Sequence, residues 1–309
     1  MTTSWRGKRV GVLLGGLSAE QEISRLTGAG VCSALRERGY AVIPIEVDAA
    51  GSWMTHIRDV DVVFIALHGK LGEDGTVQGV MELLGIPYTG SGVLASALAM
   101  NKPMAKRVWQ ACGLPTPAWQ VVSDKVTAEI SLPYPVVVKP STEGSSVGVS
   151  IVRSAEALAE SLAAAFRYDS QVLVESYIAG QEVTVGIVNE RALGAMEVIA
   201  KGEFHSYDVK YTAGREEFIL PAPLSSAVYD RLLHVALSAH RALGCSGYSR
   251  VDTRVNDRGE IFLLEVNSLP GLTALSYLPR IAGYVGLSYG DLVETILGQA
   301  ACQIQRGRG

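Results

Sequence analysis

The first hundred residues alternate short apolar runs with amphipathic segments, a pattern that predicts a parallel sheet. The mainly apolar run 9–14 ends at a glycine pair, as expected for a buried strand that leads into a tight turn. A helix is expected over 21–38, and Ser18 and Gln21 have the spacing of a capping box at its start. Strands that alternate with helices form parallel sheets with right-handed crossovers. The further elements expected here are strands at 41–47 and 60–67 and helices at 77–84 and 93–100.

The rest of the chain carries two more groups of strands and helices. Together with the N-terminal sheet they predict an α/β fold with α+β lobes. The polar segment 201–217 lacks apolar periodicity and is expected to be a long ordered loop, of the kind that often acts as a lid. The elements expected are helices near 101–111, 154–166, 226–243, 275–282 and 287–304, strands at 118–122, 134–139, 147–152, 171–175, 182–188 and 192–199, and a hairpin of strands 247–255 and 260–267.

Length and composition narrow the class of protein. The chain has 309 residues, more than one core usually covers, so we expect lobes at 1–98, 99–180 and 181–309. The net charge is −4 and no basic stripe is present, which argues against nucleic-acid binding. No apolar run approaches the ~18 residues of a membrane span, and the polar start lacks a signal peptide's apolar core. We therefore expect a cytoplasmic protein. Its four scattered cysteines lack metal-ligand spacing, so a structural zinc is not expected.

The hairpin is the element whose register can be derived from the sequence. If the four residues 256–259 form the turn, Val255 pairs with Glu260, and the remaining pairs follow from that one. Asp252 and Glu265 are then diagonal neighbours, with Cα atoms about 7–8 Å apart. The same register pairs Arg250 with Glu265 and Asp252 with Leu263.

One face of this hairpin is unusually polar. Side chains alternate between the faces of a strand, so Arg250, Asp252, Glu265 and Asn267 share a face. Carboxylate oxygens at that separation can flank a hard cation such as Mg²⁺, with phosphates in the remaining positions. The alternative is a solvated face with an incidental ion pair.

A loop rich in glycine and serine follows a buried strand that ends in Lys139. Its residues, 140–148, can direct backbone N–H groups and hydroxyls at phosphate oxygens, and the lysine adds positive charge. The loop matches neither the Walker A nor the Rossmann glycine pattern. The alternative is a flexible surface loop.

Six motifs lie in order along the chain, at 15–20, 67–69 with 72–75, 139–148, 207–211, 250–252 and 264–273. Together they resemble the D-alanine-D-alanine ligase family of the ATP-grasp superfamily, over about residues 8 to 300. One motif alone would be weak evidence, but six in the family's order make a chance match negligible. The resemblance implies an ATP-grasp fold with an N-terminal parallel-sheet pre-ATP-grasp domain.

The resemblance also implies that the protein binds ATP with two magnesium ions, or manganese in their place. Asp252, Glu265 and Asn267 would hold the metals, in agreement with the polar hairpin face. The residues implied to contact ATP are Lys102 and Lys139 at the phosphates, Ser145 and Ser146 in the loop, Glu175, Ser176, Tyr177 and Ile178 at the adenine, Glu182 at the ribose, and Lys210 at the γ-phosphate.

Two molecules of D-alanine are the substrates that the resemblance implies. Phosphorylation of the first carboxylate would give an acyl phosphate, which the amine of the second D-alanine would attack. Such a site needs positioning and charge stabilisation more than a nucleophilic side chain. The residues implied are Glu20 at the first ammonium, His68 near the substrate carboxylates, Ser145 and Tyr211 in a hydrogen-bonded network with Glu20, Lys210 in the lid, Arg250 at the oxyanion, and Ser276 at the second carboxylate, with Gly271 and Tyr277 beside it.

The identity of the second substrate has an alternative at this point. A sister ligase would use D-lactate, D-serine or another amine. Tyr211 favours the dipeptide, because depsipeptide-forming relatives often carry Phe there. Tyr277, however, stands where many relatives have a smaller aliphatic side chain, so the size of the second subsite is in doubt. The non-enzymatic alternative is an inactive nucleotide-binding regulator, against which the complete set of metal ligands and phosphate lysines argues. The family further implies a homodimer. The charge and the lack of a long apolar run lead us to expect no nucleic-acid or membrane partner.

Overall fold

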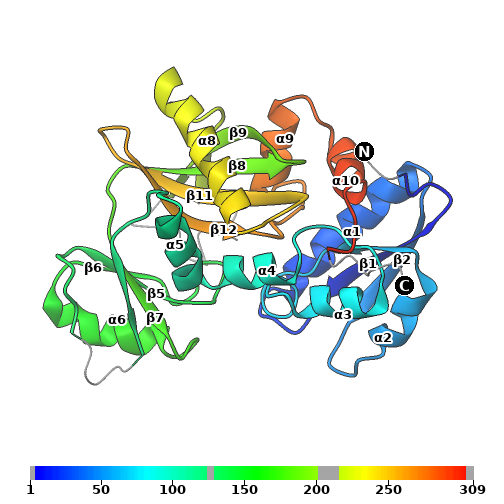
Figure 1. The fold of residues 1–309 in the computed structure, drawn as a ribbon, viewed down its shortest axis with the longest axis horizontal. Helices are drawn as coiled ribbons and strands as arrows, with labels where there is room; N and C mark the ends of the chain where they lie inside the picture. The colour runs from blue at the N-terminus through cyan, green and yellow to red at the C-terminus, as the bar shows by residue number, and fades with distance from the viewer. Residues whose placement is uncertain (1–3, 124–128, 201–215, 304–309) are drawn as a thin grey trace.

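The computed structural model describes residues 4–123, 129–200 and 216–303. The described strands form three sheets, and Figure 1 shows the three-stranded and four-stranded sheets toward opposite ends of the molecule, with the five-stranded sheet between them. Each sheet is backed by its own helices.

The N-terminal sheet is parallel, as predicted, with the strand order β2-β1-β3. All apolar side chains of β3 and most of those of β1 are buried, and helix α1 packs on β1 and β2. The elements of this part are β1 (Arg9–Gly15), α1 (Gln21–Glu37), β2 (Ala41–Val47), α2 (Trp53–His56), the 3-10 turn η1 (Ile57–Asp59), β3 (Val62–Ile65), α3 (Thr76–Leu84) and α4 (Val93–Met100).

The prediction of a capping box at the start of α1 was wrong. Glu20 is the N-cap residue, and its side chain makes no cap hydrogen bond. The Ser18 hydroxyl instead donates to the carbonyl of His68 at 2.7 Å and accepts the N–H of Glu20 at 3.1 Å. Ser18 therefore ties the start of α1 to the loop after β3, which fixes Glu20 beside His68.

The four-stranded sheet has the order β4-β7-β5-β6, and its neighbouring strands are antiparallel. The strand expected at 147–152 begins only at Ser150, because 147 and 149 donate turn hydrogen bonds back to 144 and 146. The helix expected at 154–166 starts as a 3-10 turn. The elements are α5 (Lys102–Ala111), β4 (Trp119–Val122), β5 (Val136–Pro140), β6 (Ser150–Val152), η2 (Ala155–Ala157), α6 (Leu158–Ala165) and β7 (Val172–Ser176).

The five-stranded sheet is antiparallel, with the order β10-β9-β8-β11-β12. Most of the long loop expected at 201–217 lies outside the described residues, but its last two residues open strand β10. The elements are β8 (Gln181–Val188), β9 (Arg191–Ala200), β10 (Glu216–Ile219), α8 (Ser226–Ala242), β11 (Tyr248–Val255), β12 (Ile261–Asn267), α9 (Tyr277–Tyr284) and α10 (Tyr289–Leu297).

The last helix returns to the N-terminal sheet. Helix α10 packs against α1, and its Glu294 accepts hydrogen bonds from Arg38 at 2.6 Å and from Tyr40 at 2.7 Å. The expectation of a helix reaching 304 was wrong: α10 ends at Leu297, and Ala301 then pairs with Tyr88. These contacts hold the N-terminal sheet against the chain that follows the hairpin, so the two can form a site together.

Candidate functional site

The hairpin carries its polar face as predicted, but in a different register. Asp252 lies directly opposite Glu265, not opposite Leu263, and Val255 pairs with Ile261. The turn is one residue longer than expected because the side chain of Asn256 accepts the N–H groups of 258 and 260. An irregularity in the pairing after Asp252 then shifts the register by one more residue. The two carboxylates are therefore closer neighbours than the sequence predicted.

Cationic and polar groups hold both carboxylates in place. Arg250 donates to both oxygens of Asp252, at 2.9 and 2.8 Å, and the Asn267 amide donates to one of them at 3.1 Å. Burial alone would lower the pKa of Arg250, but the charge of Asp252 outweighs burial and raises it. Glu265 pairs with the ammonium group of Lys102 at 3.1 Å.

This donor set fits a magnesium ion that is bound together with phosphate. Within the described residues no group of three histidine, cysteine or acidic side chains forms a metal cluster. Two carboxylates on facing strands, with the carbonyl oxygen of Asn267 beside them, still supply hard oxygen donors. Magnesium is commonly held by one or two carboxylates plus substrate phosphates. These oxygens could hold a metal ion whose remaining ligands come from phosphate.

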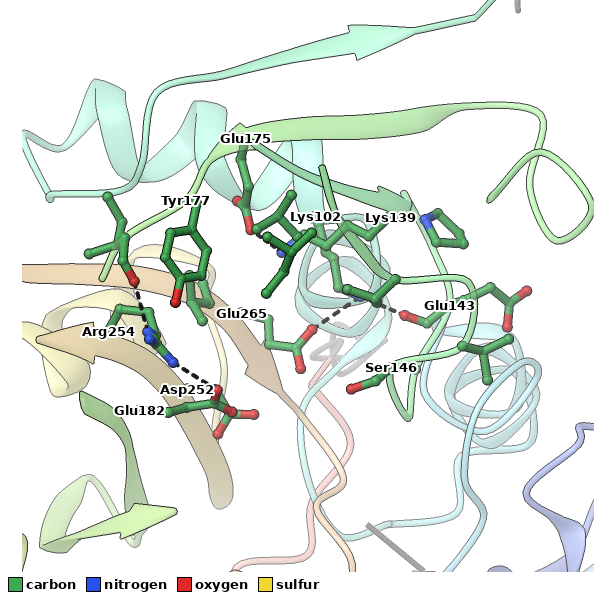
Figure 2. Close-up of a pocket in the computed structure, with 18 of the residues that line it drawn as sticks. Lys102, Lys139, Glu143, Ser146, Glu175, Tyr177, Glu182, Asp252, Arg254 and Glu265 are labelled. Atoms are coloured by element: carbon green, nitrogen blue, oxygen red, sulfur yellow. Dashed lines mark hydrogen bonds and ion pairs between the residues drawn. The ribbon is translucent and has the colours of Figure 1, made fainter. Parts of the chain in front are cut away.

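A first pocket lies between the glycine-serine loop and the hairpin (Figure 2). Val137, Ile151 and Leu264 give the lining apolar surface, which suits a flat ring, and charged side chains line the pocket as well. The predicted residues that line it are Lys102, Lys139, Ser146, Glu175, Ser176, Tyr177, Ile178, Glu182, Asp252 and Glu265.

Arg254 also lines this pocket, and sequence reasoning missed it. Its guanidinium donates to the carbonyls of Ile178 at 3.1 Å and Gly180 at 2.8 Å, and it pairs with Glu182 at 3.3 Å. Figure 2 shows Arg254 beside Tyr177, two residues along β11 from Asp252. One side chain therefore connects the segment that follows β7 to the strand that carries the carboxylate of Asp252.

Three charged side chains form a buried cluster behind the pocket. Glu175 pairs with Lys139, which lines the pocket, and with Lys106 at 2.7 Å, which does not. Burial lowers the pKa of Lys106 to about 8. Burial alone would raise the pKa of Glu175, but the two ammonium groups outweigh it and hold that pKa below its usual range. Lys106 is a second residue that sequence reasoning missed.

The glycine-serine loop has an unusual backbone. Ser145 and Ser146 both have positive φ, 50° and 57°, which is uncommon for residues other than glycine. Such strain is typical of sites that clamp a ligand. The Ser145 hydroxyl donates a short hydrogen bond to Glu20 of the N-terminal sheet region. The loop therefore connects the first pocket to Glu20, which does not line that pocket.

A second pocket lies between α1, the hairpin and α9. The described residues predicted for substrate binding or catalysis all line it: Glu20, His68, Ser145, Arg250, Gly271, Ser276 and Tyr277, together with the predicted metal ligands Glu265 and Asn267. Lys210 and Tyr211, also predicted here, lie outside the described residues. Gly144 and Glu265 line both pockets, so the two meet at the loop and the hairpin.

His68 is held at the edge of the second pocket by two side chains. Its Nε2 lies 3.0 Å from the Thr27 hydroxyl, and its Nδ1 lies 3.4 Å from a Glu73 carboxylate oxygen. Glu73 also accepts the N–H of Gly69 at 3.2 Å and lines the pocket. Gly69 has φ +70°, and a Cβ there would meet the Cβ of Ser18 at 2.9 Å, so glycine is favoured at this position. The only sequence signal for Glu73 was its place within the second motif.

The far wall of the second pocket is a stack of aromatic and cationic groups. The guanidinium of Arg250 lies 5.1 Å from the ring centre of Tyr277, which meets Phe218 edge-on at 5.6 Å. On the loop before α9, a Cβ on Gly271 would approach the Ser276 hydroxyl to 2.9 Å. Tyr277 therefore packs on the predicted oxyanion residue, where a smaller side chain would leave more room.

The described helices include none that is both long and apolar enough to cross a membrane.

Both halves of the chain match known protein families. The family model described as "D-ala D-ala ligase C-terminus" matches residues 108–298, and the model "D-ala D-ala ligase N-terminus" matches residues 9–59 and 54–91. Relatives named "D-alanine--D-alanine ligase" from Geotalea uraniireducens and Geobacter sulfurreducens are each 53% identical to the chain. The first alignment covers 97% of both proteins, and the second covers 97% of this chain and 96% of the relative.

Solved structures agree with the sequence relatives. A D-alanine–D-alanine ligase from Bacillus anthracis, in complex with ATP, superposes with a TM-score of 0.84 at 34% identity, covering 94% of this chain and 97% of that one. A VanG D-Ala:D-Ser ligase from Enterococcus faecalis has a TM-score of 0.84 at 30% identity, covering 94% of this chain and 99% of that one. The family models and the sequence relatives span nearly the whole chain. The chain belongs to the D-alanine–D-alanine ligase family.

Proposed function

We propose that this protein uses ATP to join two molecules of D-alanine into a dipeptide for cell-wall synthesis. The observation that carries the proposal is the junction of the two pockets at Gly144 and Glu265. A γ-phosphate in the first pocket would lie next to a carboxylate in the second. Holding two reactants in this way supplies much of the rate enhancement in phosphoryl transfer.

The reaction activates a carboxylate before an amine attacks it. One carboxylate oxygen of the first D-alanine attacks the γ-phosphorus, and ADP leaves. The amine of the second D-alanine, having lost a proton, then attacks the carbonyl carbon of the acyl phosphate. Inorganic phosphate departs with the bridging oxygen. Acyl phosphates hydrolyse readily, so a site that excludes water is needed.

The side chains have separate roles in this scheme. Glu20 binds the ammonium group of the first D-alanine, and Ser145 orients Glu20 through their short hydrogen bond. Arg250 stabilises the tetrahedral oxyanion; it is fixed by Asp252 and by the ring of Tyr277. Ser276 and Gly271 receive the carboxylate of the second D-alanine, with His68 near the first.

The nucleotide side rests on the first pocket. Lys102 and Lys139 bind phosphate oxygens, the segment from Glu175 to Ile178 holds the adenine, and Glu182 holds the ribose. Asp252, Glu265 and Asn267 would hold two magnesium ions, which when bound neutralise charge on the phosphates. Lys210 and Tyr211 are proposed to close the site over the substrates.

The broader organisation is part of the same proposal. We place the lobe boundaries near 98 and 180, so that ATP lies between the second and third lobes and D-alanine between the first and third. A homodimer in the cytoplasm, where ATP is available, is the proposed working form.

Release of phosphate from ATP tests this function and its main alternative. The E. faecalis relative is named a D-Ala:D-Ser ligase, so D-serine is a second candidate for the second subsite. D-alanine alone is expected to support phosphate release, and L-alanine is not, because separate groups fix the ammonium and carboxylate positions and the L-isomer would then direct its methyl group elsewhere. D-serine or D-lactate, added with limiting D-alanine, should give less product than D-alanine. Faster release with D-serine or D-lactate would assign the protein to a sister activity.

A further inference from the structure

Lys106 is a fully buried lysine that the scheme above does not use. It lies one helical turn after Lys102 on α5, has no exposed surface, and is absent from the lining of both pockets. Lysine is almost never fully buried unless it is paired, because removing an ammonium group from water is costly. Its partners here are Glu175 at 2.7 Å and the Thr116 hydroxyl at 2.6 Å. The position of Lys106 therefore calls for a reason beyond packing.

The charges in this buried cluster do not balance, and the imbalance is directed at the pocket. Glu175 contributes one negative charge, and Lys106 and Lys139 contribute two positive charges. Only Lys139 and Glu175 reach the pocket, and Figure 2 shows their contact on its wall. Without Lys106, the remaining pair would be neutral, and Glu175 would compete with phosphate for the ammonium of Lys139.

We propose that Lys106 is a positioning residue for phosphate binding: it neutralises Glu175 from behind, so that Lys139 keeps its positive charge for the phosphates of ATP. The inference rests on the assignment of Lys139 to phosphate in the proposed function. It adds a residue that touches neither nucleotide nor metal and acts through Glu175.

Hydrogen bonds through Thr116 also fix the position of the Lys106 ammonium group relative to the hairpin. Thr116 accepts the hydrogen bond from Lys106 and donates its own to the carbonyl of Leu263, at 2.8 Å. Leu263 is on β12, two residues before Glu265. One connected chain of contacts thus runs from the carboxylate strand of the hairpin to Lys106 and on to Lys139.

Binding of tripolyphosphate, measured with magnesium in the full-length protein, tests the proposal without adenine contacts or turnover. Lys106→Met and Lys106→Gln remove the charge, and Gln keeps a hydrogen-bonding group. Both are expected to weaken tripolyphosphate binding by about 10- to 100-fold, the range for a lost hydrogen bond to a charged group. Adding Glu175→Gln to Lys106→Met removes the competing carboxylate, so the double variant should return to near the wild-type affinity.

Arg107→Met is the matched control, because Arg107 is the next residue on α5 and is exposed. It removes one positive charge from the surface and should change affinity by no more than about twofold, since exposed charges are screened. Wild-type affinity in the single variants would overturn the proposal, as would a double variant as weak as Lys106→Met. If neither single variant folds, the double variant decides, since it leaves no carboxylate in the buried cluster: binding tenfold weaker than wild type contradicts the charge role. The proposed function would instead be contradicted if the wild-type protein binds tripolyphosphate more tightly than the single variants, as expected, but forms no dipeptide.

Discussion

Glu265→Gln is expected to remove nearly all ATP-dependent turnover while the protein stays folded. Glu265 lies at the junction of the two pockets, opposite Asp252, and pairs with Lys102. Glutamine keeps the shape but loses the charge that would hold magnesium and the phosphates together. Outer-shell partners of metals are worth ~10–100-fold, so loss of a direct ligand should cost at least about 100-fold in kcat.

Glu260→Gln provides the control for this experiment. Glu260 lies in the turn of the same hairpin and is exposed, at the end away from Asp252 and Glu265. The same change of chemistry there should leave the rate near wild type. Phosphate release by Glu265→Gln at a rate close to that of Glu260→Gln, at ordinary magnesium, would mean that Glu265 holds no metal.

Glu20→Gln is expected to weaken binding of the first D-alanine without preventing ATP binding. The Glu20 carboxylate lines the second pocket and accepts a hydrogen bond from Ser145. A charged hydrogen bond is worth roughly 1.5–3 kcal/mol, so KM for the first D-alanine should rise about 10- to 100-fold. Initial rates over a wide range of D-alanine separate the two KM values.

Glu22→Gln is the natural comparison, since Glu22 lies in the same first turn of α1 and its side chain is exposed. It should leave both KM values unchanged. An unchanged first KM in Glu20→Gln, or an equal rise in both variants, would remove Glu20 from the substrate site.

The sequence predicted the parts of the site that depend on local pattern. Consecutive apolar residues in β1 predicted a buried parallel strand, and alternation in β11 and β12 placed Asp252, Glu265 and Asn267 on one face. The register itself was wrong, because it depended on a side chain, Asn256, that lengthened the turn, and on an irregularity with no local signal.

What the sequence could not predict depends on contacts between distant segments. Lys106 has the pattern of a solvated helix lysine, and only the approach of Glu175 on β7 explains its burial. Arg254 likewise gains its role from the carbonyls of Ile178 and Gly180, which lie far from it in sequence. The prediction that the last helix reaches 304 was wrong for a similar reason. The helix ends at Leu297, and Ala301 then pairs with Tyr88, which is far away in the sequence.

The path of one oxygen atom tests the central claim most directly. D-alanine labelled with ¹⁸O in both carboxylate oxygens is incubated with the protein, ATP and magnesium, and the products are analysed by mass spectrometry. If an acyl phosphate forms and is attacked by an amine, each phosphate released carries one ¹⁸O from the substrate, and the new amide carbonyl keeps the other. Phosphate without ¹⁸O, or release of phosphate without a dipeptide, would contradict the account.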